Sequence, residues 1–98
     1  MYIIKHINEF DDWLNDLKDN TVRLRLARRL DKASRGLLGD VESVGEGISE
    51  MREHFGAGWR MYYVVRGNEI IIMLGGGSKS TQKNDIKTAK KRAKQLEG

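Results

Sequence analysis

The clearest pattern of apolar and polar positions lies between residues 59 and 74. Two runs rich in β-branched, aromatic and other apolar residues, 59–66 and 69–74, are separated by Gly67 and Asn68. Two residues of this type between such runs are typical of a tight hairpin turn with positive φ angles. Because side chains alternate along a strand, one face of the hairpin is wholly apolar or aromatic and is predicted to be core: Trp59, Met61, Tyr63, Val65, Ile70, Ile72 and Leu74.

A two-residue loop also determines which residues of the hairpin face each other. It places Arg66 opposite Glu69, and it places Arg60 level with Gly75. The second face of the hairpin is apolar in its middle and carries an arginine at each end, so it needs cover from another element. The charged end of the sheet that holds Arg60 is predicted to be exposed, and function is expected there.

Apolar residues at helical spacing predict two helices before the hairpin. Asn8 can cap the first helix. Residues 19–21 interrupt the apolar pattern and offer an N-cap for the second helix. Gly36 is the expected C-cap of that second helix. The core-facing stripes are Phe10, Trp13, Leu14 and Leu17, then Leu26, Leu30, Ala33 and Leu37. So short a joint predicts an antiparallel helical hairpin packed over the sheet.

The second helix is rich in basic residues outside its apolar stripe. They are predicted to face solvent, with contact to a partner as the alternative: Arg23, Arg25, Arg28, Arg29, Lys32 and Arg35.

Shorter signals complete the order of elements. Residues 2–4 are β-prone, 39–47 hold three glycines and are predicted to be a loop, and 49–55 are predicted to be a strand. Thr81 or Asn84 caps a final helix with a thin apolar stripe: Ile86, Ala89, Ala93 and Leu96. The order β, α, α, three β, α predicts an α+β domain whose later strands form an antiparallel meander.

Length and composition narrow the class of protein. A chain of 98 residues forms one domain, which buries only about 60–70% of its unfolded surface. It has no cysteine for disulfides or thiolate metal sites. Its apolar runs are too short to cross a bilayer, and its first residues do not resemble a signal peptide, so a soluble cytoplasmic protein with no membrane partner is expected.

Charge is distributed unevenly along the chain. Residues 78–98 contain seven basic and two acidic side chains, whereas residues 1–77 contain eleven basic and twelve acidic ones. The positive excess therefore lies in the final helix and the segment before it. A polyanionic partner would explain this placement, and a solvated helix face is the alternative.

The sequence contains no familiar catalytic or metal-binding pattern. The glycines at 75–77 and Lys79 lack the spacing of a Walker A loop, although the segment could form an anion-binding nest of backbone N–H groups or a flexible exit from the sheet. The acidic residues within 39–47 do not have the spacing of an EF-hand calcium loop. The two histidines, His6 and His54, are too few for a histidine-based metal site. No metal and no cofactor are predicted.

Three ordered stretches resemble a known family. They are Gly47-Ile-Ser-Glu-Met-Arg52, Gly56-Ala-Gly-Trp-Arg-Met-Tyr-Tyr63 and Leu74-Gly-Gly-Gly-Ser-Lys-Ser-Thr-Gln-Lys-Asn-Asp-Ile86. They are similar to the addiction-module killer proteins, also called phage Gp49-like or HigB-type, of the RelE/ParE toxin superfamily. The helical half is similar too, through Phe10-Asp-Asp-Trp-Leu and through Arg29-Leu followed by Gly36-Leu-Leu-Gly39-Asp40. The resemblance covers nearly the whole chain and implies a RelE-like fold: an N-terminal helical hairpin on a twisted, mainly antiparallel sheet, with the last helix near the active face.

The resemblance also implies an activity and partners. The activity is that of a ribosome-dependent endoribonuclease that cuts mRNA during translation, and the partners are the ribosome, mRNA and a cognate antitoxin, usually a helix-turn-helix protein like HigA. A metal-free mechanism suits this activity: attack by a ribose 2′-OH builds charge on a phosphorane, which arginine and lysine stabilise.

Particular residues match the superfamily's functional positions. Arg60 matches its Gly-aromatic-Arg position, Arg52 a basic position on the preceding strand, and Lys79 a basic position after the last strand. These three are the predicted catalytic residues, as stabilisers of the transition state. Relatives often carry a late Tyr or His as acid or base, and none follows Lys79 here, so Glu50 and His54 are the candidates. Contact with RNA is predicted for Lys83, Lys87, Lys91 and Lys94.

Two other functions stay open from the sequence. One is a ParE-like inhibitor of DNA gyrase, which binds and poisons rather than cuts. The other is a non-catalytic nucleic-acid-binding module that uses the basic tail. Clustering of Arg52, Arg60 and Lys79 at one end of the sheet would favour the nuclease, and scattered basic residues would favour a binder.

Overall fold

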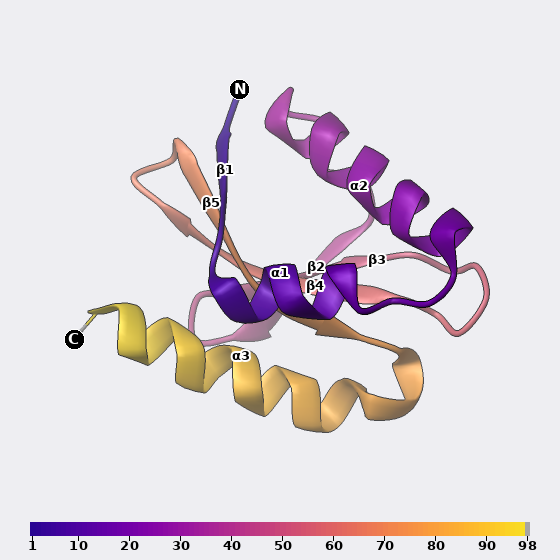
Figure 1. Ribbon diagram of the computed structural model, residues 1–98. Coiled ribbons are helices and arrows are strands. Elements are labelled where there is room, and N and C mark those ends of the chain that lie inside the picture. Colours follow the sequence, from indigo (N-terminus) through magenta and orange to yellow (C-terminus); the bar gives the residue numbers. More distant parts are fainter. Residues whose placement is uncertain (98) are drawn as a thin grey trace.

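In the computed structural model, which describes residues 1–97, a five-stranded sheet has the two N-terminal helices on one face and the C-terminal helix on the other (Figure 1). The elements are β1 (Ile3–His6), α1 (Asn8–Asn15), α2 (Asn20–Ser34), β2 (Val41–Gly45), β3 (Ile48–Arg52), β4 (Arg60–Arg66), β5 (Ile70–Gly77), a 3₁₀ turn (Lys79–Thr81) and α3 (Gln82–Glu97). The predicted α+β class, with two N-terminal helices and a C-terminal helix on a mainly antiparallel sheet, is confirmed.

The strands lie in the order β1-β5-β4-β3-β2. β1 pairs with β5 in parallel, and the other neighbours are antiparallel. The prediction of a loop at 39–47 was wrong, because β2 lies within it and pairs with β3. Val41 and Val44 are half-buried on opposite faces, and 45–47 all have positive φ. Two of the three glycines therefore form the tight turn that joins two strands.

The β4–β5 turn forms as predicted, but the register differs. Gly67 and Asn68 both have positive φ, and the N–H of Glu69 donates to the carbonyl of Arg66. However, Arg66 pairs with Ile70 rather than with Glu69. The strand pairing is thus offset by one residue from the prediction, which exchanges the two faces of β5.

A β-bulge in the same pair shifts the register a second time. The shift falls between Tyr62 and Tyr63 on β4, so Arg60 lies opposite Gly77 instead of Gly75. On β4 the predicted apolar face is correct for Trp59, Met61 and Tyr63, but Val65 is exposed. On β5 the prediction is wrong, because Ile71 and Met73 take the places expected for Ile70, Ile72 and Leu74.

Both faces of the sheet are covered by helices, as predicted from the apolar residues in the middle of each face. α1 and α2 cover one face with a cluster that contains Phe10, Leu26, Leu30, Ala33, Met51, Met61, Tyr63, Ile71 and Met73. α3 covers the other face with Ile48, Tyr62, Val64, Leu74, Ala89 and Ala93. The helical stripes at 10–17 and 26–33 are confirmed as core, whereas Leu37 lies beyond the end of α2 and is exposed.

The helix starts are partly as predicted. Asp19 caps α2, with its carboxylate accepting from the N–H groups of Thr21 and Val22. Asn8 does not cap α1, because it is already the first helical residue. Ser78, three residues before Thr81, is the N-cap of the 3₁₀ turn that precedes α3, and it forms a capping box with Thr81. None of the helices within residues 1–97 is long and apolar enough to cross a membrane.

Candidate active site at one end of the sheet

Three adjacent strands bring the predicted basic residues to the same end of the sheet. Arg52 on β3 is the Cα partner of Arg60 on β4, and Arg60 is in turn the partner of Gly77 on β5. Lys79 follows in the 3₁₀ turn, where its N–H donates to the carbonyl of Ala57 over 3.2 Å. The basic residues are therefore clustered rather than scattered.

Arg60 is the central and most enclosed of the three. Only 6% of it is exposed, so the prediction that it lies at an exposed end was wrong. Its Nη1 donates to the carbonyls of Trp59 (3.2 Å) and Glu53 (3.3 Å), while its Nε has no partner among the described residues. Gly58, with φ +72°, lies between Arg60 and Lys79, and a Cβ there would stand 3.1 Å from the Cβ of Lys79.

Arg52 is held by two carboxylates at the β2 side of the site. It forms ion pairs with Glu42 and, over 3.0 Å, with Asp40. Asp40 also accepts a 2.7 Å hydrogen bond from Nε2 of His54. The hydrogen bonds from Arg52 and then His54 lower the pKa of Asp40 to about 2, and the bond with Asp40 raises the pKa of Arg52. Both partners of Asp40 therefore keep a carboxylate beside them at any physiological pH.

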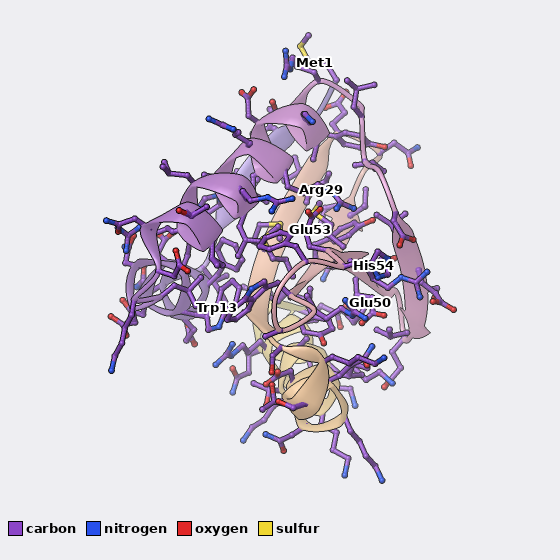
Figure 2. All side chains as sticks on the ribbon, turned by 90° about the vertical axis from the view of Figure 1, so that its right-hand side faces the viewer. Met1, Trp13, Arg29, Glu50, Glu53 and His54 are labelled. Atoms are coloured by element: carbon purple, nitrogen blue, oxygen red, sulfur yellow. The ribbon has the colours of Figure 1, made fainter. Side chains whose placement is uncertain are left out.

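Glu50 is buried beneath α3. It is 2% exposed, and its two carboxylate oxygens accept from Nε2 of Gln82 over 3.0 and 2.9 Å. Glu50 lies opposite Tyr62, whose hydroxyl has no partner among the described residues. Burial, followed by the charges of Glu50 and Asp85, raises the pKa of Tyr62. The two candidate bases are thus in different settings, with Glu50 enclosed and His54 exposed (Figure 2).

Gln82, Tyr62 and Asp85 belong to this end of the sheet and were not predicted. A signal exists for Tyr62, since it lies two residues after Arg60 on a strand and so shares its face. Gln82 and Asp85 lie in the first turn of α3, and only the tertiary fold brings them to Glu50 and to Gly77.

The lysines of α3 separate into two groups. Lys83 and Lys87 line an open hollow of about 230 Å³ with Ser80, Thr81 and Asn84. Lys94, with Lys90, forms ion pairs with Glu46 in the β2–β3 turn. Lys91 is exposed. Lys83 and Lys87 are the pair that lies nearest in sequence to Lys79.

One arginine of α2 is structural, contrary to the prediction that all of them face solvent. Arg29 is 8% exposed and forms an ion pair with Glu53 (Figure 2). It also donates to the carbonyls of Leu38, Asp40 and Arg52. Arg29 thereby ties α2 to Asp40, which directly precedes β2, and to Arg52 at the end of β3. Within residues 1–97, no group of three or more His, Cys, Asp or Glu side chains could hold a metal ion.

Comparison with known proteins decides the family. The sequence model of the family described as "Phage derived protein Gp49-like" matches residues 12–94. The chain belongs to this family. A Haemophilus influenzae (strain Rd) protein recorded as "Uncharacterized protein" is 40% identical over 93 residues, which cover 95% of this chain and 94% of that protein. The predicted Gp49-like membership is confirmed.

A solved structure shows the same fold for this Gp49-like protein. A chain of the intact Escherichia coli RelBE toxin–antitoxin complex superposes with a TM-score of 0.64 at 15% identity, covering 80% of this chain and 96% of that one. The likeness confirms the predicted RelE-like fold.

Proposed function

We propose that this protein is the toxin of a type II toxin–antitoxin system and acts as a metal-independent endoribonuclease on mRNA at the ribosome. Membership of the Gp49-like family and the RelE-like fold support a toxin. The observation that carries the enzymatic part is the gathering of Arg52, Arg60 and Lys79 at one end of the sheet. A plain nucleic-acid binder needs no such cluster around a buried arginine.

In this mechanism the basic residues stabilise the charge that develops on the phosphate. Arg60 is preorganised by two carbonyls, and its Nε has no protein partner among residues 1–97. Preorganised donors are worth more in an enclosed site than in water. Arg60 therefore contacts the phosphorane, while Lys79 approaches it from the exposed 3₁₀ turn.

His54 is the better candidate for acid and base. Its ring is exposed and held by Asp40, an arrangement that orients an imidazole for proton transfer. Both carboxylate oxygens of Glu50 are instead engaged by Gln82 under α3, so Glu50 positions the helix against the sheet.

The test is induction in cells, with growth measured and mRNA 5′ ends mapped. Arg60→Ala should remove arrest and new 5′ ends, since removing a donor that stabilises the transition state costs about 2–4 kcal/mol, or roughly 30- to 1,000-fold in rate. Arg66→Ala is the matched control, because Arg66 lies at the other end of β4. Because Arg60 is buried, folding of each variant is checked by circular dichroism. A folded Arg60→Ala protein that still arrests growth at full strength would refute the assignment.

The proposed partner is a cognate antitoxin of the helix-turn-helix type, with the toxin acting in the cytoplasm. Co-expression with the proteins encoded by neighbouring genes should identify one that restores growth and gives a complex that purifies intact. If no neighbouring protein restores growth, the toxin–antitoxin assignment fails.

A further inference from the structure

The edge of β5 is open where it passes between α1 and α3. β1 pairs with β5 only as far as Met73, whereas β5 continues to Gly77. No strand within residues 1–97 therefore covers the outer edge of 74–77. A cleft of about 190 Å³ lies at this edge and is lined by Glu9, Trp13, Gly75, Gly76, Asp85, Thr88 and Arg92.

Glycine allows both walls of this cleft to lie directly on the strand. A Cβ on Gly76 would collide with the six-membered ring of Trp13, which lies over it from α1. A Cβ on Gly75 would stand 2.6 Å from Nη1 of Arg92, which reaches down from α3 and donates to the carbonyl of Leu74 over 2.8 Å. Any larger residue at either position would displace a wall of the cleft.

The lining suits a small flat group with both donors and acceptors. Trp13 provides an aromatic surface, Arg92 a guanidinium, and Glu9 and Asp85 carboxylates. The two carboxylates disfavour a phosphate, and the space is below the range of pockets that enclose drug-sized ligands. A nucleobase matches: it stacks on aromatic rings and presents donors to carboxylates and acceptors to arginine.

The cleft adjoins the candidate active site. Gly77, the strand partner of Arg60, is the next residue after Gly76 and packs against Asp85, which also lines the cleft. We propose that the cleft binds one base of the RNA, next to the phosphate at Arg60, and so contributes sequence preference. This inference rests on the proposed function for the identity of its ligand.

The test is a titration of ¹⁵N-labelled protein with AMP, GMP, CMP and UMP, and with ribose 5-phosphate as the control that lacks a base. At least one nucleotide should shift the Gly76 amide and the Trp13 indole N–H saturably, with a Kd of about 1–10 mM for a single stacked base. The signal of Gly36, which follows α2 and has no side chain of α3 beside it, serves as an internal reference.

Two variants test the lining without disturbing the core. Thr88→Val and Glu9→Gln should each weaken the binding about tenfold for the loss of one hydrogen bond, and Thr21→Val, an exposed threonine on α2, should leave it unchanged. The inference is overturned if no nucleotide shifts these signals in the millimolar range, if ribose 5-phosphate shifts them equally, or if both variants bind as the wild type does.

The two proposals fail separately in this design. A protein that cuts mRNA yet binds no mononucleotide at Gly76 loses the base site and keeps its function. A protein that binds nucleotides there but cuts no RNA keeps the base site and loses the proposed nuclease activity.

Discussion

Replacing Arg29 tests whether one buried side chain holds together the end of the sheet that carries the candidate active site. In Arg29→Met the apolar part of the side chain is kept and the guanidinium is removed. The carbonyls of Leu38, Asp40 and Arg52 then lose their donor, and Glu53 loses its ion-pair partner. The side chains of Arg29 and Glu53 are only 9% and 21% exposed, so water compensates for little of this loss.

The expected loss of stability is large for so small a domain. Removing one partner of a buried ion pair costs about 3–5 kcal/mol, because the other charge stays buried and unpaired. Domains are stable by only about 5–15 kcal/mol. Arg29→Met should therefore remove at least about a fifth of the free energy of unfolding, and most of it if the domain is marginally stable. Arg29→Lys should recover little of it, since one ammonium cannot replace a planar fork that bonds three carbonyls.

Urea denaturation followed by circular dichroism measures the change. The matched control is Arg28→Met, one residue away on α2 but exposed, which should change stability by less than about 0.5 kcal/mol. A decrease below about 1 kcal/mol for Arg29→Met would show that the hydrogen bonds of Arg29 do not hold β2 and β3 to α2.

Three further outcomes are expected. Trp13→Ala should lower the free energy of unfolding by about 3–5 kcal/mol in the same denaturation assay, because Trp13 packs on Gly76 and against Phe10 and Trp59; an unchanged midpoint would contradict this. The pKa of Asp40 is lowered from 3.8 to about 2, so the stability that its carboxylate contributes is complete above about pH 4 and is lost as the pH falls towards 2. In denaturation experiments at a series of pH values, Asp40→Asn should therefore reduce the loss of stability between about pH 4 and pH 2. An unchanged loss would rule out Asp40 as its source. Replacing Lys83, Lys87 and Lys91 by Glu should weaken RNA binding in filter assays. The slope of the logarithm of the binding constant against the logarithm of the salt concentration should become less steep by about 0.7 for each phosphate that is no longer neutralised. An unchanged slope would show that RNA does not contact α3.

Local periodicity predicted most of the fold. Helical stripes and the Gly67-Asn68 turn depend on neighbouring residues alone, and both are confirmed. The register of β5 was wrong for two reasons: Glu69 belongs to the loop, so that Arg66 pairs with Ile70, and a bulge between Met73 and Gly75 adds one more residue. No local signal in the sequence distinguishes either feature. β2 was missed because glycine-rich sequence favours a loop, although Gly45 and Gly47 form only the turn that ends this strand.

The candidate site was only partly predictable for a related reason. The basic residues on strands could be placed by alternation, but burial depends on what covers them. Nothing near Arg29 in the sequence separates it from the exposed Arg28, and the carbonyls that it binds lie nine or more residues away. The Gln82–Glu50 hydrogen bond spans 32 residues and follows only from the docking of α3.

Under the proposed function, the charges at this end of the sheet give the lysines of α3 and the buried arginine different roles in binding RNA. Arg52 is neutralised by Asp40 and Glu42, and Arg60 is buried. Lys83 and Lys87 line an open hollow and have no ion-pair partner among residues 1–97. An approaching phosphate chain therefore meets the lysines of α3 first and reaches Arg60 only after docking. Salt screens exposed charges beyond about 10 Å at 0.1 M but acts weakly on enclosed ones. Rising ionic strength should then weaken binding steeply while the rate of cleavage in the bound complex changes little.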